Sequence, residues 1–224
     1  MLSTNTGPGE NKVKRLFILI ACALEAACVA PMENRNGRGE FVVTPEARRA
    51  LESAPLCCAS SAQFSFEPLR RGERLNVRID AARPAFEFQS GKSYFLAYRL
   101  PDRTTPIEVT IRSWFHGTAF FPSVLLLDDA FVQKRFITFP EVHYVAPSFF
   151  ERGHVEGNVR IDPGEAAAYL VVLTTEADMH RSTTSEISST VFFSGKTPIF
   201  VPGGGYANDY GPIGSLRIDV SAAR

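Results

Sequence analysis

Apolar and polar residues alternate along much of the chain. In RLNVRID (74–80), IEVTIRS (107–113) and SLRIDV (215–220), every second residue is apolar and the residues between are polar or charged. A period of two is typical of a β-strand that turns one face to the core and the other to water. The alternation therefore predicts a fold built mainly from strands.

Two other segments are apolar without alternation. VLLLD (124–128) and AYLVVLTT (168–175) are short and continuous, so their period allows either a helix or a strand. The bounding residues Pro122 and Gly164, and the threonines that end the second run, favour strands. We expect both strands to be covered on both faces.

Two acidic residues, Asp128 and Asp129, follow the first run and raise the question of a catalytic carboxylate pair. Neighbouring strand residues point to opposite faces, whereas such a pair needs carboxylates that face one another. Aspartate also forms turns, because its side chain accepts hydrogen bonds from nearby backbone N–H groups. We therefore interpret the two acids as a turn that ends a buried strand.

One segment has a helical pattern. In TPEARRALESA (44–54), Thr44 is the expected N-cap and Pro45 the first helical residue, with apolar residues along one face. Elsewhere, about ten short apolar runs separated by Gly, Pro and Asp predict an all-β domain of the β-sandwich or jelly-roll type. We place this domain at residues 61–224, and a linker with the short helix at residues 29–60.

The N-terminal residues 1–28 are interpreted as an export signal. Basic residues in NKVKR precede an apolar run at 16–27 that is too short to cross a bilayer as a helix. Cys22 and Cys28 are both candidates for lipidation, since each follows small residues as in a lipoprotein signal. Cys22 leaves a short apolar core, and Cys28 has Glu25 where leucine is usual. An ordinary secretory signal or an uncleaved anchor is the alternative.

The charge balance excludes one class of partner. Lys and Arg together number 24, as do Asp and Glu. Nucleic-acid binding requires clustered basic residues that displace counterions from phosphates, and the sequence has no basic stripe. We therefore expect no nucleic-acid partner, and we expect membrane contact through the N-terminal signal or its lipid.

The remaining cysteines, Cys57 and Cys58, are adjacent in APLCCASS. Neighbouring cysteines can pair only through a strained ring, because their Cα atoms are closer than in an ordinary disulfide. We expect two small buried residues, or one thiol paired with a partner chain. A metal or redox role would call for a C-x-x-C pattern or nearby histidine, and neither is present.

Motifs that would indicate catalysis are incomplete. SGKT (194–197) has Thr190 where a phosphate-binding loop needs glycine, and its flanks are strand-like. GGGYANDYG (203–211) is not followed by a helical pattern, and no G-x-S-x-G sequence occurs. The histidines are too far apart in sequence to form a local ligand pair: His116, His143, His154 and His180. We expect no enzymatic activity, no cofactor and no metal site.

One set of residues has the composition of a carbohydrate site. Saccharides need an aromatic face for their C–H groups and planar polar groups for their hydroxyls. The segments SWFHG and GGGYANDYG supply both kinds: Trp114, His116, Tyr206, Asn208, Asp209 and Tyr210. We retain them as candidate carbohydrate-binding residues, with core packing of the aromatics as the alternative.

Three segments, taken in order, resemble the maltose operon periplasmic protein family, MalM. They are FFPSVLLLDDAF (120–131), HVEGNVRIDPGEAAAYLVVLTTEADM (154–179) and GSLRIDV (214–220), and the likeness extends over about 64–220. The resemblance implies export to the periplasm or outer membrane and a link to carbohydrate transport through the operon. It implies no established catalytic residue.

These observations lead to a functional expectation. We expect a protein of the periplasm, anchored to the outer membrane, with a non-enzymatic accessory role in carbohydrate transport of the maltose or maltodextrin type. Its expected partners are a carbohydrate and envelope transport or porin proteins. The alternative is a structural or protein-interaction envelope lipoprotein without a small-molecule ligand.

Overall fold

The computed structural model describes residues 45–101, 104–115, 118–138, 143–145, 153–187, 190–201 and 204–223. The predicted export signal, with Cys22 and Cys28, lies outside these ranges, as does most of the predicted linker. Among the helices of the described ranges, none has the length and apolar character needed to cross a bilayer.

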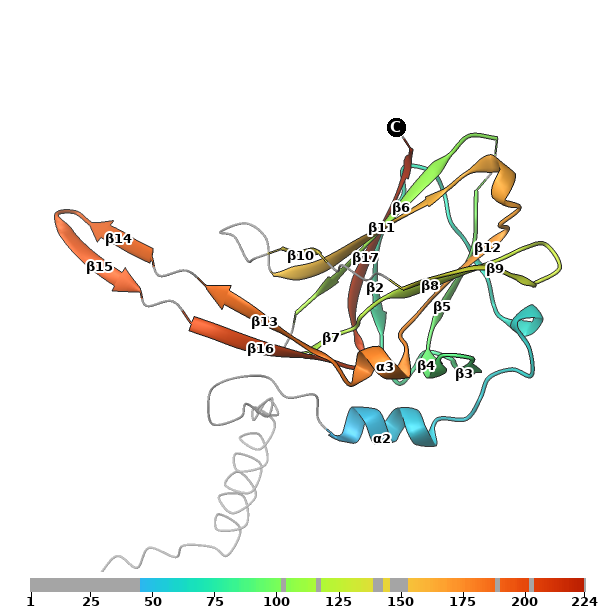
Figure 1. Ribbon diagram of the computed structural model, residues 1–224, viewed down its shortest axis with the longest axis horizontal. Helices are drawn as coiled ribbons and strands as arrows, with labels where there is room; N and C mark the ends of the chain where they lie inside the picture. Colours follow the sequence, from blue (N-terminus) through green and yellow to red (C-terminus); the bar gives the residue numbers. More distant parts are fainter. Residues whose placement is uncertain are drawn as a thin grey trace, which may run out of the picture. The chain divides into compact units, whose positions relative to one another are not determined.

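Two five-stranded sheets form the body of the domain and confirm the predicted all-β fold (Figure 1). The first, called the β12 sheet, contains β1 (Glu67–Pro68), β5 (Leu96–Arg99), β12 (Tyr169–Leu173), β8 (Ser123–Leu127) and β9 (Gln133–Thr138), in that order. The second, called the β6 sheet, contains β10 (His143–Val145), β11 (His154–Ile161), β6 (Ile107–Trp114), β17 (Gly214–Ala222) and β2 (Arg74–Ile79). Apart from the parallel pair β1–β5, their strand pairs are antiparallel.

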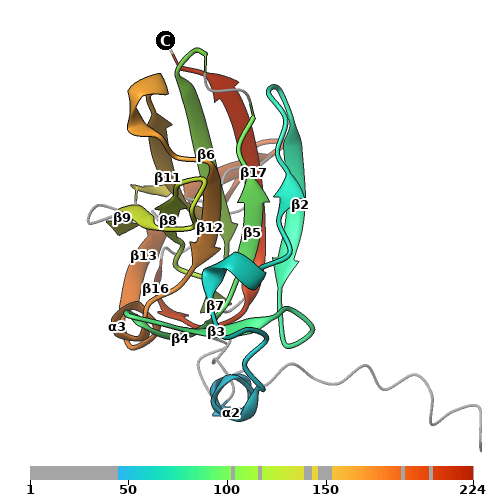
Figure 2. The same cartoon turned by 90° about the vertical axis from the view of Figure 1, so that its right-hand side faces the viewer.

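The two sheets pack face to face around one shared core (Figure 2). Alternate residues of β6, such as Val109 and Ile111, are fully buried, as the period of two predicts. The core also includes Val159, Leu216, Ile218 and Val220 from the β6 sheet, and Leu96, Tyr98, Val124, Leu126, Leu170 and Val172 from the β12 sheet. Each fully buried side chain of this size stabilises the fold by about 1.5–3 kcal/mol. The domain is thus a β-sandwich.

A second apolar layer covers the outer face of the β12 sheet. Leu125 of β8 and Val171 of β12 point away from the core between the sheets and into this layer. The segment around Phe64 and the hairpin of β3 (Ala85–Phe88) and β4 (Gly91–Tyr94) supply the cover. The aromatic layer, as it is called below, consists of Phe64, Phe66, Phe86, Phe88, Phe95, Phe131, Phe136 and Tyr169. The prediction that β8 and β12 are strands covered on both faces is confirmed.

The turn after β8 settles the role of Asp128. Its Oδ1 accepts hydrogen bonds from the backbone N–H groups of Ala130 and Val132, each at 2.9 Å. Phe131 in the same turn has a left-handed backbone with φ of 60°. This conformation brings its ring to 4.9 Å from that of Tyr169, centroid to centroid. Asp128 is therefore a turn residue, as predicted, and the turn delivers an aromatic ring to the aromatic layer.

The helix predicted at 44–54 is confirmed as α2 (Pro45–Ser53). Its Leu51 belongs to the core between the sheets. At the end of the helix, Lys92 Nζ donates hydrogen bonds to the carbonyl oxygens of Glu52, at 2.7 Å, and Ala54, at 2.6 Å. These bonds satisfy carbonyl groups that the end of a helix leaves without partners.

The strand that the sequence predicts to continue to Thr175 ends earlier, and a second helix, α3 (Glu176–Met179), follows it. β12 ends at Leu173, and the Thr175 hydroxyl accepts a hydrogen bond from the Asp178 backbone N–H at 3.0 Å. Here the helix-capping hydrogen bond of Thr175 outweighs the strand propensity of threonine. The chain therefore turns into a helix at the end of the buried strand.

The remaining strands form smaller sheets. β13 (Ser182–Ile187), β16 (Gly204–Tyr210) and β7 (Thr118–Ala119) form one of three strands, while β14 (Thr190–Ser194) pairs with β15 (Thr197–Val201). The glycine-rich segment 203–211 is thus mostly strand. Its pairing with β13 over Gly204–Asp209 outweighs the low strand propensity of glycine. The short 3-10 helices are η1 (Ser61–Gln63) and η2 (Pro163–Glu165).

Candidate functional site

Trp114, the first predicted carbohydrate residue, lies at the end of β6 on the outer face of the β6 sheet. The Arg217 guanidinium lies over its ring, 5.4 Å from the centroid. The His154 ring is 6.4 Å away, centroid to centroid. One face of the indole is therefore already occupied by an arginine, a contact that stabilises the fold by cation–π attraction.

Tyr210 belongs to a different group of side chains. It is 4% exposed and packs edge-to-face against Phe121, with 4.9 Å between ring centroids. Ala119 and Val155 complete this small buried cluster. The ring of Tyr210 therefore serves packing, the alternative that the sequence left open for aromatic residues.

The other predicted residues are described only in part. Asp209 lies at the end of β16, where it pairs with Thr118 of β7. Tyr206 and Asn208 have their backbones in β16, paired with β13, and their side chains lie outside the description. His116 also lies outside the described residues. A carbohydrate role for these residues stays a prediction.

The outer face of the β6 sheet carries a network of paired charges. Arg112 on β6 donates to Glu156 on β11 and lies 3.4 Å from Asp219 on β17. Asp219 also accepts from Arg217, at 3.1 Å, and from Arg74, at 2.6 Å. Since each charge has opposite charges beside it, this face is a solvated, internally satisfied surface.

The outer face of the β12 sheet is different, because a cleft of about 250 Å³ interrupts its cover. The β3–β4 turn lies on one side and β9 on the other. The lining residues are Phe88, Gln89 and Ser90 from the turn, Leu125 from β8, and Gln133 and Phe136 from β9. All of them are uncharged, and the polar ones are amides and a hydroxyl. The cleft combines aromatic walls with planar hydrogen-bonding groups.

The turn side of this cleft is held by close contact with α3. Phe88 pairs with Gly91 across the turn, and the backbone N–H of Glu176 donates to the Ser90 carbonyl at 2.9 Å. Gly91 has φ of +104°, and a Cβ placed there would lie 2.7 Å from the Glu176 Cβ. Only glycine fits this backbone and this spacing. The positions of Gln89 and Ser90 are therefore fixed by the fold.

A β-bulge shapes the other side of the cleft. Arg135 pairs with Leu126, but Gln133 rather than Lys134 pairs with Leu127. The extra residue on β9 reverses the alternation, so Gln133 lies on the same face as Phe136. Without the bulge, Lys134 would occupy that face, since strand residues alternate. The bulge thus places an amide, instead of an ammonium group, beside the cleft.

A second cleft, of about 200 Å³, lies between α2, the β3–β4 hairpin and α3. Its walls carry charges of both signs, including Arg48, Glu87 and Glu176. Arg48 donates to the Met179 carbonyl and approaches His180 Nδ1 at 3.3 Å. Arg48 thereby fastens α2 to α3, and we interpret this cleft as a junction between the two helices.

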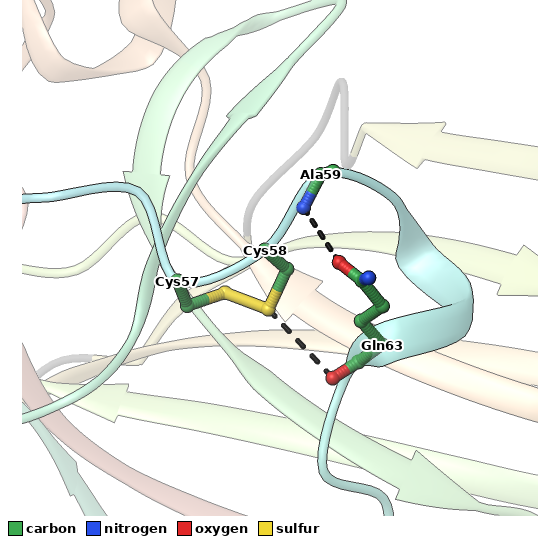
Figure 3. Close-up of a disulfide and its surroundings, with 4 residues drawn as sticks. All are labelled: Cys57, Cys58, Ala59 and Gln63. Atoms are coloured by element: carbon green, nitrogen blue, oxygen red, sulfur yellow. Dashed lines mark hydrogen bonds between the residues drawn. A yellow bond between two sulfur atoms is a disulfide. The ribbon is translucent and has the colours of Figure 1, made fainter.

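Cys57 and Cys58 form a disulfide with each other (Figure 3). The expectation of two small buried residues, or of pairing with a partner chain, is wrong. Cys57 is exposed and Cys58 is half-buried against the aromatic layer. Residues around the pair have neither helical nor regular strand geometry, so the backbone can accommodate the ring. The Sγ of Cys58 lies 3.7 Å from the Gln63 carbonyl oxygen, a contact and not a hydrogen bond in the disulfide form, which has no S–H.

Two tyrosines of the core have a raised pKa. Burial raises the pKa of Tyr98 to about 12, and burial together with the negative charge of Asp80 raises the pKa of Tyr94. Both side chains lie in the core between the sheets and stay protonated at neutral pH. In the ranges that the structure describes, no group of three His, Cys, Asp or Glu residues is arranged for a metal ion. The expectation of no enzymatic activity stays a prediction.

Fold and clefts together define the class: an all-β sandwich protein with a neutral cleft beside an aromatic layer. Residues 90–195 match the family described as maltose operon periplasmic protein precursor (MalM). This match covers the chain from just before β4 to the tip of the β14–β15 hairpin.

A curated relative supports the same family. The maltose operon periplasmic protein of Salmonella typhimurium strain LT2 is 24% identical over 170 residues. The alignment covers 74% of this chain and 55% of the relative, so the chain spans about half the length of that protein. The resemblance predicted from the sequence is confirmed: the chain is similar to proteins of the MalM family.

Proposed function

We propose that this protein is exported to the periplasm and has a non-enzymatic accessory role in carbohydrate transport of the maltose or maltodextrin type. The observation that carries the proposal is the family match over residues 90–195, whose description names the maltose operon. The neutral cleft is compatible with it, because its lining combines aromatic rings with amide and hydroxyl groups.

The proposal includes attachment to the outer membrane through a lipid on Cys22 or Cys28. Its support is the basic and then apolar pattern of residues 1–28. Mass spectrometry of the protein extracted from membranes should find a diacylglyceryl-modified N-terminal cysteine. An unmodified N-terminus in the soluble periplasmic fraction would refute the anchor and leave export intact.

An uptake measurement tests the transport role. In the native host, removal of the gene should lower the initial rate of uptake of labelled maltodextrins at limiting external concentration, and the wild-type gene should restore it. Uptake of an unrelated nutrient such as proline serves as the control. Unchanged maltodextrin uptake, measured at concentrations where transport limits growth, would contradict the role.

A specific observation favours the alternative, an envelope protein that acts by binding other proteins. The β14–β15 hairpin exposes apolar side chains, with Phe193 72% and Phe200 63% exposed, and with Val191 and Ile199 each about half exposed. Exposed apolar residues gathered on one element are typical of interaction surfaces. In the part of the chain that the structure describes, β14 and β15 pair only with each other, so the outer edge of each strand offers backbone groups to which another chain can pair.

Photo-crosslinking distinguishes this alternative. A photoreactive amino acid at Phe193 or Phe200 should form adducts with an envelope protein in intact cells if the hairpin binds a partner. The control position is Val132, an exposed apolar residue in the turn after β8. Adducts from the hairpin but not from Val132, together with unchanged maltodextrin uptake in the deletion strain, would favour the alternative.

A further inference from the structure

The cleft in the cover of the β12 sheet has the chemistry of a sugar site. Phe88 and Phe136 provide aromatic surface, and Leu125 is the buried apolar residue of its lining. Gln89 and Gln133 add an amide on each side. A pyranose ring has the matching character, with C–H groups that pack on aromatic rings and hydroxyls that bond to amides.

The charge and size of the cleft narrow the ligand class. The six lining residues are uncharged, so the cleft offers no counter-charge to a phosphate, a carboxylate or an amine. Its volume of about 250 Å³ lies below the range of about 300–1,000 Å³ that is typical for drug-sized ligands. Such a cleft suits a single ring. We propose that it binds one ring of a neutral saccharide, a proposal that rests on the proposed role in carbohydrate transport.

Ser90 gives an independent indication of a ligand. Its hydroxyl oxygen is buried and makes no hydrogen bond within the described structure. A buried hydroxyl without a partner costs free energy, so such groups are usually satisfied by protein, water or ligand. The hydroxyls of Ser113, Ser123 and Thr174 are also buried without a partner, but among these residues only Ser90 lines the cleft, and the proposal assigns a sugar hydroxyl to it.

The two sides of the cleft are preorganised. α3 holds the Gln89–Ser90 turn through the Glu176 N–H, and Gly91 permits the close approach. The bulge at Lys134 holds Gln133 on the cleft face. Side chains fixed before binding lose less conformational entropy when the ligand arrives.

Isothermal titration calorimetry of the purified full chain with maltoheptaose tests the proposal. Ser90→Ala should raise the Kd about three- to tenfold through loss of one hydrogen bond, and should leave the melting temperature of the free protein equal or higher. Gln133→Ala should raise the Kd by a similar factor. Phe136→Leu keeps apolar bulk but removes the aromatic face, and it should raise the Kd at least as much. A variant that is as stable as the wild type but binds less tightly identifies a binding role.

Trp114 marks the competing carbohydrate site predicted from the sequence, and it is the single tryptophan of the chain, on the outer face of the other sheet. If the sugar binds at the cleft and not at Trp114, two results follow. The fluorescence of Trp114 should not change when maltoheptaose binds at the cleft, and Trp114→Leu should keep the wild-type Kd. Binding that is lost in Trp114→Leu and kept in the three cleft variants would overturn the proposal while leaving the transport role standing. Absence of measurable binding of maltoheptaose at millimolar concentration would also overturn it, and the uptake measurement would then decide the transport role separately.

Discussion

The outer faces of the two sheets differ in what covers them. The β12 sheet is covered by an aromatic layer, and its outward residues, such as Leu125 and Val171, are buried. Within the described residues, the β6 sheet has no such cover over Arg112, which pairs with Glu156 and Asp219 in partial contact with water. Both sheets contribute equally regular inner faces to one core. The difference shows that the cover, and not the core, creates the hollow in which a ligand can be held.

Phe64→Ala should have the largest effect, because it removes the ring at the centre of the aromatic layer. Phe64 is 6% exposed and contacts the rings of Phe86 and Phe95 at 4.9 and 4.3 Å. We expect the free energy of unfolding, measured by urea denaturation, to fall by about 3–5 kcal/mol. Thr110→Ala on the outer face of the β6 sheet is the counterpart and should lower it by only about 0.5–1.5 kcal/mol, through loss of the hydrogen bond that the Thr110 hydroxyl donates to Asn158. Similar losses for both variants would remove the distinction between the faces.

Gly91→Ala should have the next largest effect. The new Cβ would adopt an unfavourable φ of +104° and meet Glu176 at 2.7 Å. We expect a loss of about 1–3 kcal/mol in chemical denaturation.

Gly72→Ala is the matched control for this substitution. Gly72 also has positive φ, at +73°, but a Cβ there would meet no atom within 4 Å. The difference between the two variants therefore measures the contact between the β3–β4 turn and α3. Equal losses would show that this contact does not hold the turn.

Asp128→Ala should destabilise the turn that carries Phe131 into the aromatic layer. Two backbone N–H groups would lose their acceptor, so we expect a loss of about 1–2 kcal/mol. Asp129 provides the neighbouring control, since it accepts neither of these two hydrogen bonds and Asp129→Ala should therefore cost less than Asp128→Ala. If Asp128→Ala kept its thermal stability but abolished maltoheptaose binding, the carboxylate would be part of a site and its interpretation as a turn residue would be wrong.

Much of the contrast between the outer faces of the two sheets could not be predicted from the sequence. The inner faces follow from local alternation, as in β6, and the continuous apolar run of β8 indicates a strand covered on both sides. The residues that cover the outer face of the β12 sheet are brought there by long-range packing. No pattern in the sequence around Phe64 or Phe86 indicates that they pack against β8. The glycine-rich 203–211 becomes strand because it finds a partner in β13.

The candidate site was predictable to a smaller extent. Trp114 is an outward residue by its place in the alternation of β6, but the burial of Tyr210 depends on contact with Phe121. The cleft joins segments about 45 residues apart, as seen in the numbering of Phe88 and Gln133. It also depends on a β-bulge, which is a property of the register between two strands and has no signature in one of them. The adjacent cysteines show the same limit, since their pairing depends on the backbone between them.

The smallest effect should come from the charged face of the β6 sheet. A double-mutant cycle with Arg112→Ala and Glu156→Ala should give a coupling energy of about 0.2–1 kcal/mol, as for ion pairs in contact with solvent. Added salt should reduce it. A coupling above about 3 kcal/mol would show that this face is shielded from water in the assembled protein, and the contrast between the sheets would then be smaller than the structure indicates.

Hydrogen–deuterium exchange with and without maltoheptaose tests the central claim most directly, that the covered face of the β12 sheet holds the ligand site and the charged face of the β6 sheet does not. We expect slower exchange at the β3–β4 turn, in 88–91, and along β9, in 133–137, when the sugar is present. Exchange in 110–114 and 215–219 should be unchanged. Protection confined to those two β6-sheet segments, with no change at the turn or at β9, would contradict the account.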